Sequence, residues 1–546
     1  MDWAPASAVR WLFSSQRGPA DRLLPRWLFL RAFGLIYFSA FFSLAFQIRG
    51  LIGPEGILPA NQYLQAVARA FTGTTRLWYA PTLLWFSGSS TMLMALCWVG
   101  MVASVLLVLN LWPRGMLVIC LVCFLSFVSA AQDFSGYQSD GMLLEAGFIA
   151  LFFAPSGFRP GLAPSRPPSR MSLFLLLWEW FRIYFESGVV KLASGDPQWR
   201  HFTAMDEYYQ NGPLPTWIGW YIQHLPHGFH AFTVYATLAL ELGLVWMMFL
   251  PRRWRIGLFF LVTGWQAVVI LTANYTFLNY LVLSLAVLLL DDRFLSRLFK
   301  LWPFAASSVS PTPRTDEPPT ANQPDSVPSP TRSILLQWRT AYDWLKLSIA
   351  ALMLSWVVYA TTVPLIWMFS TAIPFPIKPI TNLEPFRIAN RYGLFAVMTR
   401  GRYEIEFQGS ADGQNWTPYP FRYKPQDVKT PPGIYAPYQP RFDWNLWFAS
   451  LGGWRDYPIV TNTEVRLLEN DKDVLSLFAG NPFTQQPPQQ VRAVLWQYWF
   501  TSMAEKDLTG NWWRRQLLGL YAPVLEREPD GTIVVVEMPG EGQVHK

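Results

Sequence analysis

Cysteine is scarce in this chain. Only three occur among 546 residues, and all of them, Cys97, Cys120 and Cys123, lie in apolar stretches. No cysteine follows Cys123, which excludes a disulfide framework in the rest of the chain. Cys120 and Cys123 are three residues apart, but no basic or ligand-type side chain accompanies them. We therefore interpret them as packing residues and expect neither a redox pair nor a metal site.

Charged residues are also few. Asp, Glu, Lys and Arg make up 14% of the chain, whereas a soluble domain has about 25%, and hydrophobic residues make up 52%. The 28 tryptophans and 22 tyrosines suit aromatic belts at two membrane interfaces. The net charge of +7 lies largely in short loops beside apolar runs, where membrane orientation explains it, so we expect no nucleic-acid partner. The composition predicts a multi-pass membrane protein with a soluble part.

The short motifs of several enzyme classes are absent as well. The sequence has no phosphate-binding loop, no Gly-x-Ser-x-Gly elbow, no HExxH motif and no dinucleotide fingerprint. Three of its five histidines, His224, His227 and His230, have a spacing that could hold zinc. Because Pro226 and Gly228 interrupt a regular helix and no carboxylate is near, we interpret them as interfacial or loop residues. We therefore expect no metal, no cofactor and no hydrolase triad.

Long apolar runs are the main feature of the sequence. A hydrocarbon core of roughly 30 Å takes about 20 helical residues, and nine runs approach or reach that length. Two of them, the fourth and the eighth, are short, and short paired runs can be re-entrant. We therefore predict a polytopic α-helical membrane bundle with about eight or nine spans. The runs are 27–47, 91–110, 115–130, 141–154, 171–192, 231–250, 256–272, 277–290 and 345–369.

Basic residues set the expected orientation. Lys and Arg are concentrated in the segments that share the cytoplasmic side if the N-terminus lies there, and they are fewer in the opposite loops. The positive-inside rule then places the N-terminus in the cytoplasm. An odd number of spans places everything after residue 369 outside, in a periplasm or an organelle lumen.

The composition divides the chain into five parts. Residues 1–26 form an inner tail, and residues 27–300 form the transmembrane bundle. Seven prolines between Ser307 and Thr331, together with Ser, Thr and Asp, predict an inner linker at residues 301–333. A last transmembrane helix follows at 334–372, and residues 379–546 form a β-rich extracytoplasmic domain.

Alternating patterns indicate strands in this C-terminal domain. Arg402–Gln408 alternates apolar and polar residues, Asp412-Gly413 follows as a turn, and an aromatic strand resumes at 416–423. A further strand is expected at 532–537, after another Asp-Gly turn. We expect a β-sandwich-like fold docked on the membrane surface, with helices at 491–500 and 512–520.

The stretch Trp178–Trp199 carries charges that a spanning helix holds only when they meet partners, water or a ligand. Glu179, Arg182 and Glu186 follow i, i+3, i+7 spacing and share one helix face, whereas Lys191 lies off that face at the outer end. One interpretation is a structural ion ladder with Lys191 reaching towards the interface. The other is a polar pocket around Lys191.

The predicted topology brings further polar residues to the outer side of the bundle. Glu145 lies about one turn into the fourth run and Glu241 about midway through the sixth, and ionisable groups at such depths face a cavity or a partner. We therefore predict a polar, aromatic-rimmed pocket open to the outside. Its intramembrane cluster is Asp140, Glu145, Glu179, Arg182, Glu186, Lys191 and Glu241, and its rim is Trp199, His201, His224, His227 and Asn274.

Several separated blocks occur in an order that is specific to one family. They read WLFLRAFGLIYFSAFFSLAFQIRGLIGPEGILPANQYL (27–64), YQSDGMLLEAGFIALFFAP (137–155), RIYFESGVVKLASGDPQWR (182–200), PLPTWIGWYIQHLP (213–226) and NRYGLFAVMTRGRYEIEFQGSADGQNW (390–416). Together they resemble the lipase maturation factor family from Trp27 to about Tyr521. The resemblance implies a multi-pass protein of the endoplasmic reticulum membrane, or of the inner membrane in a bacterium, whose C-terminal domain faces outwards. It also implies a chaperone-like role, in which that domain helps secreted client proteins, lipases in this family, to reach an active state. We expect a secreted client and membrane lipids as partners.

A shorter block is similar to another class of proteins. YFESGVVKLASGDPQW (184–199) resembles part of the membrane domain of vitamin K-dependent γ-carboxylases, where a lysine at this place is the catalytic base. Lys191 is the matching residue. Desolvation can lower the pKa of a lysine so that it acts as a base, although Glu186 would oppose that lowering. The alternatives to an assembly factor are thus a membrane enzyme with an outward-facing pocket around Lys191 and, from the intramembrane charges, a transporter.

Overall fold

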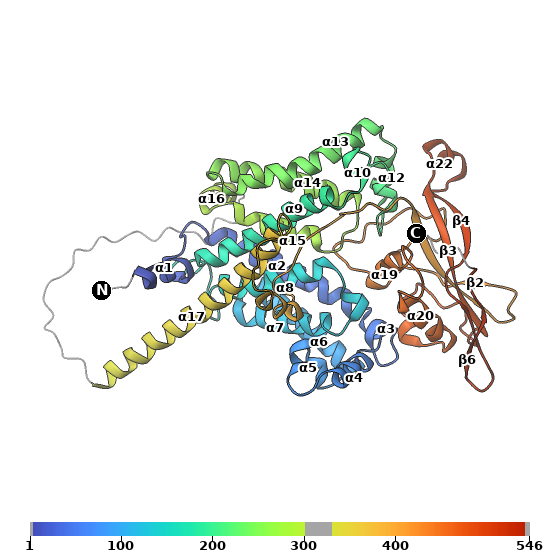
Figure 1. Ribbon diagram of the computed structural model, residues 1–546, viewed down its shortest axis with the longest axis horizontal. Helices are drawn as coiled ribbons and strands as arrows, with labels where there is room; N and C mark the ends of the chain where they lie inside the picture. The colour runs from blue at the N-terminus through green and yellow to red at the C-terminus, as the bar shows by residue number, and fades with distance from the viewer. Residues whose placement is uncertain (1–3, 301–329, 541–546) are drawn as a thin grey trace.

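A computed structural model describes residues 4–300 and 330–540 (Figure 1). Helices pack into one bundle, and a β-sheet lies at one end of it, on the right of the view. The predicted inner linker lies outside the described residues over 301–329, and the proposed domain boundaries stay predictions.

Every apolar run that we predicted as a span contains a helix. Within the part of the chain that the structure describes, five helices are long and apolar enough to cross a membrane, namely Leu23–Ala45, Ser90–Val108, His227–Phe249, Arg252–Thr272 and Ala341–Trp367. The protein is therefore a multi-pass membrane protein, whereas the count of eight or nine spans stays a prediction. With η marking 3-10 and π segments, the helices of the runs are α2 (Leu23–Ala45), α6 (Ser90–Val108), α7 (Pro113–Val128), α8 (Gln138–Phe153), α9 (Arg170–Ala193), α13 (His227–Leu238) with η4 (Ala239–Gly243) and η5 (Leu244–Phe249), α14 (Arg252–Thr272), α15 (Leu278–Ala286) with η6 (Val287–Leu289), and α17 (Pro330–Trp367).

Short helices join these long ones and decorate the C-terminal domain. In the first part of the chain they are α1 (Ala4–Phe13), η1 (Ser15–Arg17), α3 (Ile48–Ile52), α4 (Ala60–Ala70), α5 (Thr75–Tyr79), η2 (Leu83–Trp85), η3 (Gln132–Ser135), α10 (Pro197–Arg200), α11 (Tyr208–Asn211), α12 (Trp217–Gln223) and α16 (Asp292–Lys300). After α17 they are α18 (Lys378–Thr381), η7 (Glu384–Phe386), α19 (Arg441–Ala449), α20 (Pro458–Leu468), α21 (Lys472–Leu475) and α22 (Met503–Thr509).

Glycines allow the first long helices to approach closely. A Cβ at Gly100 of α6 would lie 2.5 Å from the ring of Phe41 on α2. A Cβ at Gly34 of α2 would lie 3.0 Å from the carbonyl oxygen of Ser104 on α6. Small residues are common where membrane helices meet, because tight packing replaces the hydrophobic driving force that lipid removes.

The C-terminal domain contains one six-stranded antiparallel sheet. The strand order is β2-β1-β3-β5-β6, and β4 also pairs with β3. β1 pairs with β3 over its whole length, with Ile405 opposite Leu495. Helices α19 and α20 lie on the side of the sheet that faces the bundle (Figure 1). The strands are β1 (Arg402–Ser410), β2 (Thr417–Pro418), β3 (Gln490–Phe500), β4 (Trp513–Leu520), β5 (Val524–Arg527) and β6 (Ile533–Glu537).

Three expectations for this domain were wrong. Segments 491–500 and 512–520 are strands β3 and β4 rather than helices, because pairing with β1 and with each other outweighs a local apolar spacing that also fits a helix. The aromatic strand expected at 416–423 shrinks to β2, where Pro418 and Pro420 cannot donate to a ladder. In the described residues, helices cover the sheet where a sandwich would have a second sheet.

Candidate functional site

The predicted intramembrane cluster divides into separate sites, and Arg182 is the centre of the first. Its guanidinium is fully buried, forms an ion pair with Glu145 of α8 and lies 3.9 Å from Glu186 one turn along α9. Its Nη1 also donates to the carbonyl oxygen of Asn390, at 2.7 Å. The ladder is thus completed by a residue that follows the last long helix.

A segment of the C-terminal region closes this charged site. Asn390 donates its backbone N–H and its side-chain amide to Glu145 Oε2, at 2.8 and 3.1 Å. The Tyr392 hydroxyl donates to the same oxygen at 2.9 Å and lies 3.4 Å from Glu179, while its backbone N–H donates to Glu186 at 2.7 Å. Buried charges are stable only when paired and hydrogen-bonded, so this site is a closed anchor and no open pocket.

The same segment continues along the C-terminal end of α9, and we name residues 390–399 the docking segment. The backbone N–H groups of Leu394 and Met398 donate to Ser187 Oγ and Asp196 Oδ2, at 3.2 and 2.7 Å. The Trp199 indole donates to the carbonyl oxygen of Phe395 at 3.0 Å. Successive hydrogen bonds therefore fix the docking segment on the bundle.

Lys191 forms the second site. Its Nζ lies 2.9 and 2.8 Å from the two carboxylate oxygens of Glu241 and 3.0 Å from the carbonyl oxygen of Leu394. Glu241 belongs to η4, a single π-helical turn, and the ammonium group lies 5.2 Å from the centre of the Trp199 ring. Because these acceptors occupy its N–H groups, Lys191 is a paired cation here and not a free amine.

Asp140 belongs to a third site. Both of its carboxylate oxygens accept from the guanidinium of Arg441 on α19, at 2.7 and 2.8 Å, and both side chains are buried. Arg441 also donates to the carbonyl oxygen of Phe134 at 2.7 Å. A bidentate pair of this kind fixes orientation as well as distance, so it ties α19 to the start of α8.

A cavity of about 540 Å³ lies beside Lys191. Lys191, Glu241 and Trp199 line it, together with residues of α14, α15 and the docking segment. The other members of the predicted intramembrane cluster do not line this cavity. Asp140, Glu145, Arg182 and Glu186 belong to the ion pairs described above, and Glu179 lies 3.4 Å from the Tyr392 hydroxyl.

Most of the predicted rim is also elsewhere. The His224 ring nitrogens lie 2.7 and 2.8 Å from the carbonyl oxygens of Trp220 and Thr501, and Asn274 bonds to loop 433–436 of the C-terminal domain. His227 lies 2.9 Å from Asp206, and His201 is exposed. Over residues 4–300 and 330–540, no group of three or more His, Cys, Asp or Glu side chains could hold a metal ion.

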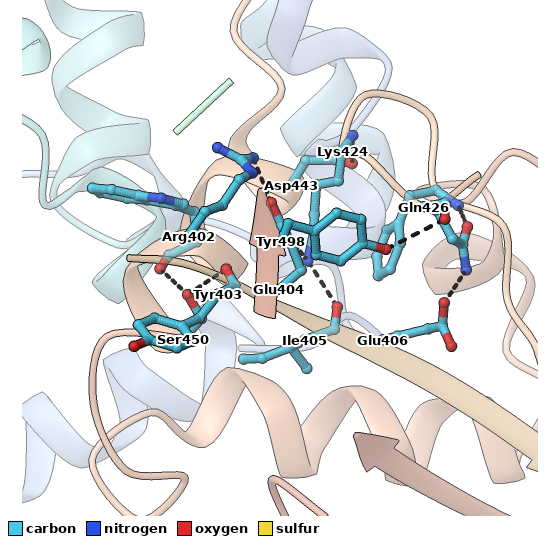
Figure 2. Close-up of polar contacts among 12 residues, drawn as sticks. Arg402, Tyr403, Glu404, Ile405, Glu406, Lys424, Gln426, Asp443, Ser450 and Tyr498 are labelled. Atoms are coloured by element: carbon cyan, nitrogen blue, oxygen red, sulfur yellow. Dashed lines mark hydrogen bonds and ion pairs between the residues drawn. The ribbon is translucent and has the colours of Figure 1, made fainter. Parts of the chain in front are cut away.

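A further polar cluster joins the first strand of the sheet to the bundle. Figure 2 shows Arg402 of β1 paired with Glu404. The buried guanidinium also donates to the carbonyl oxygens of Gln210 and Pro213, at 3.0 and 3.1 Å. Because Gln210 belongs to α11 and Pro213 to the loop after it, Arg402 fixes the sheet to the segment that follows α9 in the chain.

Lys424 extends this cluster into the domain core. Its Nζ lies 3.0 Å from Glu404 and donates to the carbonyl oxygen of Ile405 at 2.8 Å (Figure 2). The backbone N–H groups of Tyr423 and Lys424 lie 3.3 Å from Asp443 Oδ1. Burial raises the pKa of Asp443 to about 6, even though Lys424 and these N–H groups favour the carboxylate. Asp443 is therefore a buried acid whose charge costs stability near neutral pH.

Sequence reasoning missed the partners that complete these sites, Asn390, Tyr392 and Arg441. The first two lie in the block NRYGLF, which the resemblance singled out but which carries no motif for ion pairing. Arg441 precedes an aromatic helix, FDWNLWF, in which a lone arginine gives no sign of a distant carboxylate. Only the tertiary fold brings these residues to the bundle.

Comparisons with known proteins agree with the resemblance. The family model described as "Lipase maturation factor transmembrane domain" matches residues 24–297, and that described as "Lipase maturation factor C-terminal domain" matches residues 388–523. Lipase maturation factor 2 of Gallus gallus is 33% identical, over 92% of this chain and 81% of the relative. The Homo sapiens protein of the same name is 32% identical over 92% and 83%, and lipase maturation factor 1 of Bos taurus 32% over 92% and 89%.

No solved structure matches the chain. The two family matches cover most of the helical bundle and the sheet domain as far as β4, and the docking segment lies inside the second match. The relatives exceed 30% identity over most of both sequences. The chain therefore belongs to the lipase maturation factor family.

Proposed function

We propose that this protein assists secreted client proteins to reach an active, assembled state, and that its C-terminal domain makes the client contacts. The observation that carries this proposal is the match of both parts of the chain to a family whose members are named lipase maturation factors. Lipases are accordingly the first clients to test. In this proposal the C-terminal domain works outside the cytoplasm, in the lumen of the endoplasmic reticulum or in a periplasm, as the distribution of Lys and Arg favours.

The outer strand of the sheet offers a surface for such contacts. In the described part of the chain β6 pairs only with β5, so its other edge has free backbone groups. Val535 and Val536 of β6 are about half exposed, and Met538 follows them on the surface. An exposed apolar edge strand can accept an extended segment of another chain by strand addition.

The enzymatic alternative gains no support from the geometry around Lys191. A general base needs a free amine within reach of its substrate, whereas Nζ of Lys191 is held by Glu241 and by the Leu394 carbonyl oxygen. We therefore do not propose a γ-carboxylase-like reaction.

The test is secretion of active lipase by cells that lack their own maturation factor. The full chain should restore lipase activity per secreted lipase molecule, whereas a chain without residues 379–546 should not. Activity restored by the truncated chain would refute the role of the C-terminal domain. No restoration by a correctly inserted full chain would exclude lipases as its clients.

A charged edge tests the contact surface. The double variant Val535→Lys/Val536→Lys should lose most of the restored lipase activity, because lysines on an edge strand oppose pairing with another chain. Leu508→Lys is the matched control, since Leu508 on α22 is also highly exposed but lies off this edge. Equal activity of the edge variant and the wild type would exclude β6 as the client contact.

A further inference from the structure

The cavity beside Lys191 has the size and lining of a small-molecule site. Its volume of about 540 Å³ falls within the roughly 300–1,000 Å³ of typical ligand pockets. It lies between α9, α14, α15 and the docking segment, so both family domains contribute to its wall. Large aromatic side chains dominate that wall, including Trp199, Tyr208, Trp265, Phe395, Trp444 and Trp447.

The charges at the cavity wall cancel. Lys191 and Glu241 form one ion pair, and the lysine N–H groups already have acceptors. Glu241 keeps unused carboxylate lone pairs, and its side chain is partly accessible, at 13% exposure. The site therefore offers a hydrogen-bond acceptor without a free positive charge, which disfavours an anionic ligand.

The hydroxyl group of Tyr184 supplies a hydrogen-bond donor at the cavity wall. Asn279 donates to the Gln266 carbonyl oxygen at 2.6 Å, and Gln266 in turn donates to the Tyr184 hydroxyl oxygen at 2.7 Å. All three residues line the cavity. Because the tyrosine oxygen already accepts from Gln266, its own hydrogen is free to be donated to a ligand.

The backbone near Glu241 departs from a regular helix. Glu241 lies in the π-helical turn Ala239–Gly243, which continues as the 3-10 segment Leu244–Phe249. Such π turns are frequent at functional sites. Gly188 of α9 permits the close contact, since a Cβ there would lie 2.9 Å from the Glu241 Cβ. This helix distortion is a second observation, independent of the cavity, that points to a ligand.

The cavity also reaches the membrane-facing side of the bundle. Val268 of α14 lines it and is 55% exposed, and α14 is one of the helices apolar enough to span a membrane. In a bilayer such a surface contacts lipid chains. A ligand could thus enter sideways from the membrane.

From these observations we propose that the cavity binds a neutral lipid bearing a hydroxyl group. The apolar body of the lipid packs on the aromatic wall, its hydroxyl hydrogen is donated to Glu241, and its hydroxyl oxygen accepts from Tyr184. Diacylglycerols and sterols share this chemistry. The site is separate from the proposed client surface on β6, so either proposal can fail alone.

The test is photolabelling of the purified full chain in nanodiscs. The probes are a photoreactive diacylglycerol, a photoreactive sterol, the same diacylglycerol with its hydroxyl methylated, and a photoreactive fatty acid. One of the two hydroxyl lipids should label the chain saturably, on peptides of α9, α14 or the docking segment, and which of them does so identifies the source. The methylated probe should label about tenfold less, because one lost buried hydrogen bond is worth about that factor. The fatty acid should also label about tenfold less, because the site offers its carboxylate no free positive charge.

A cavity-filling variant gives the matched comparison. Val269→Trp on α14 should reduce labelling about tenfold or more, since Val269 lines the cavity. Ala267→Trp, on an exposed and non-lining position of the same helix, should label like the wild type. Unsaturable labelling by both hydroxyl lipids, equal labelling by the methylated probe, or full labelling of a folded Val269→Trp variant would each overturn the proposal. The comparison of probes uses the wild-type chain and holds even if a variant does not fold.

Discussion

Tyr392 is the point at which the C-terminal region enters the charged interior of the bundle. Its backbone N–H and its hydroxyl contact three acidic side chains of α8 and α9, of which Glu145 and Glu186 pair with the guanidinium of Arg182. An excess of buried carboxylate is tolerated only where donors surround it. The docking segment therefore supplies donors that the buried carboxylates of the bundle need.

Removing one donor from this site should destabilise the whole chain. Tyr392→Phe deletes the hydroxyl that donates to Glu145, and the loss of such a buried hydrogen bond costs roughly 1–3 kcal/mol. We expect a lower Tm in detergent, measured by tryptophan fluorescence. Tyr342→Phe, at an exposed position of α17, should leave the Tm unchanged. An unchanged Tm for Tyr392→Phe would mean that the hydroxyl has no part in the anchor.

Asp443 predicts a pH dependence of stability. Its pKa is raised in the folded state to about 6, so the folded state holds this proton more tightly than the unfolded state does. Stability from this group is therefore greatest below pH 4 and falls as the pH rises to 6. Asp443→Asn keeps an acceptor for the two backbone N–H groups and removes the charge. Relative to the wild type, the variant should gain about 3 kcal/mol between pH 4 and pH 7. Parallel pH profiles of the free energy of unfolding for the two proteins would contradict this interpretation.

At the scale of elements, the contact between α2 and α6 depends on glycines. Gly100→Val would place side-chain atoms in the Phe41 ring, and overpacking of this kind costs about 1–3 kcal/mol or more. We expect less folded protein and a lower Tm, measured after purification in detergent. Gly264→Val on α14 is the control, because a Cβ there meets nothing within 4 Å. An equal drop in folded protein and in Tm for both variants would indicate a general effect of valine and not an effect of this contact.

Elements with local signals were predictable, and elements made by distant pairing were not. The apolar runs became helices close to the expected bounds, since a membrane helix satisfies its own backbone. β1 and β6 were also expected, from alternation and from an Asp-Gly turn. The predictions for β3 and β4 were wrong because their apolar positions fit both a helical and a strand period. Only the pairing of β3 with β1, and of β4 with β3, decides between the two structures.

In the candidate site, too, features with a local sequence signal were predictable and features made by distant contacts were not. The charges of α9 meet buried partners, and a cavity lies beside Lys191 and Trp199, whereas the pocket open to the outside stays a prediction. A one-dimensional pattern could not show that Arg182 and Lys191 belong to different sites. That separation arises from the docking segment, which passes between them with Tyr392 on one side and Leu394 on the other.

For the whole molecule, the orientation in the membrane is directly testable. The chain's only cysteines are buried, so an introduced cysteine reports without background. Gln414→Cys, on the exposed turn after β1, should react with an impermeant maleimide from the extracytoplasmic side of sealed vesicles. Arg253→Cys, at the exposed start of α14, should react only from the cytoplasmic side. The opposite pattern, or reaction of both from one side, would contradict the expected topology.

The central claim is that the helical bundle and the C-terminal domain are joined into one folded body. A double-mutant cycle on Asp140 and Arg441 tests this claim most directly. The quantity is the Tm of the full chain in detergent. Asp140→Leu and Arg441→Met should each lower stability by about 3–5 kcal/mol, because each leaves a buried charge without its partner. If the two residues join the domains as described, the double variant will be more stable than either single variant. A double variant that loses the sum of both single effects would contradict it.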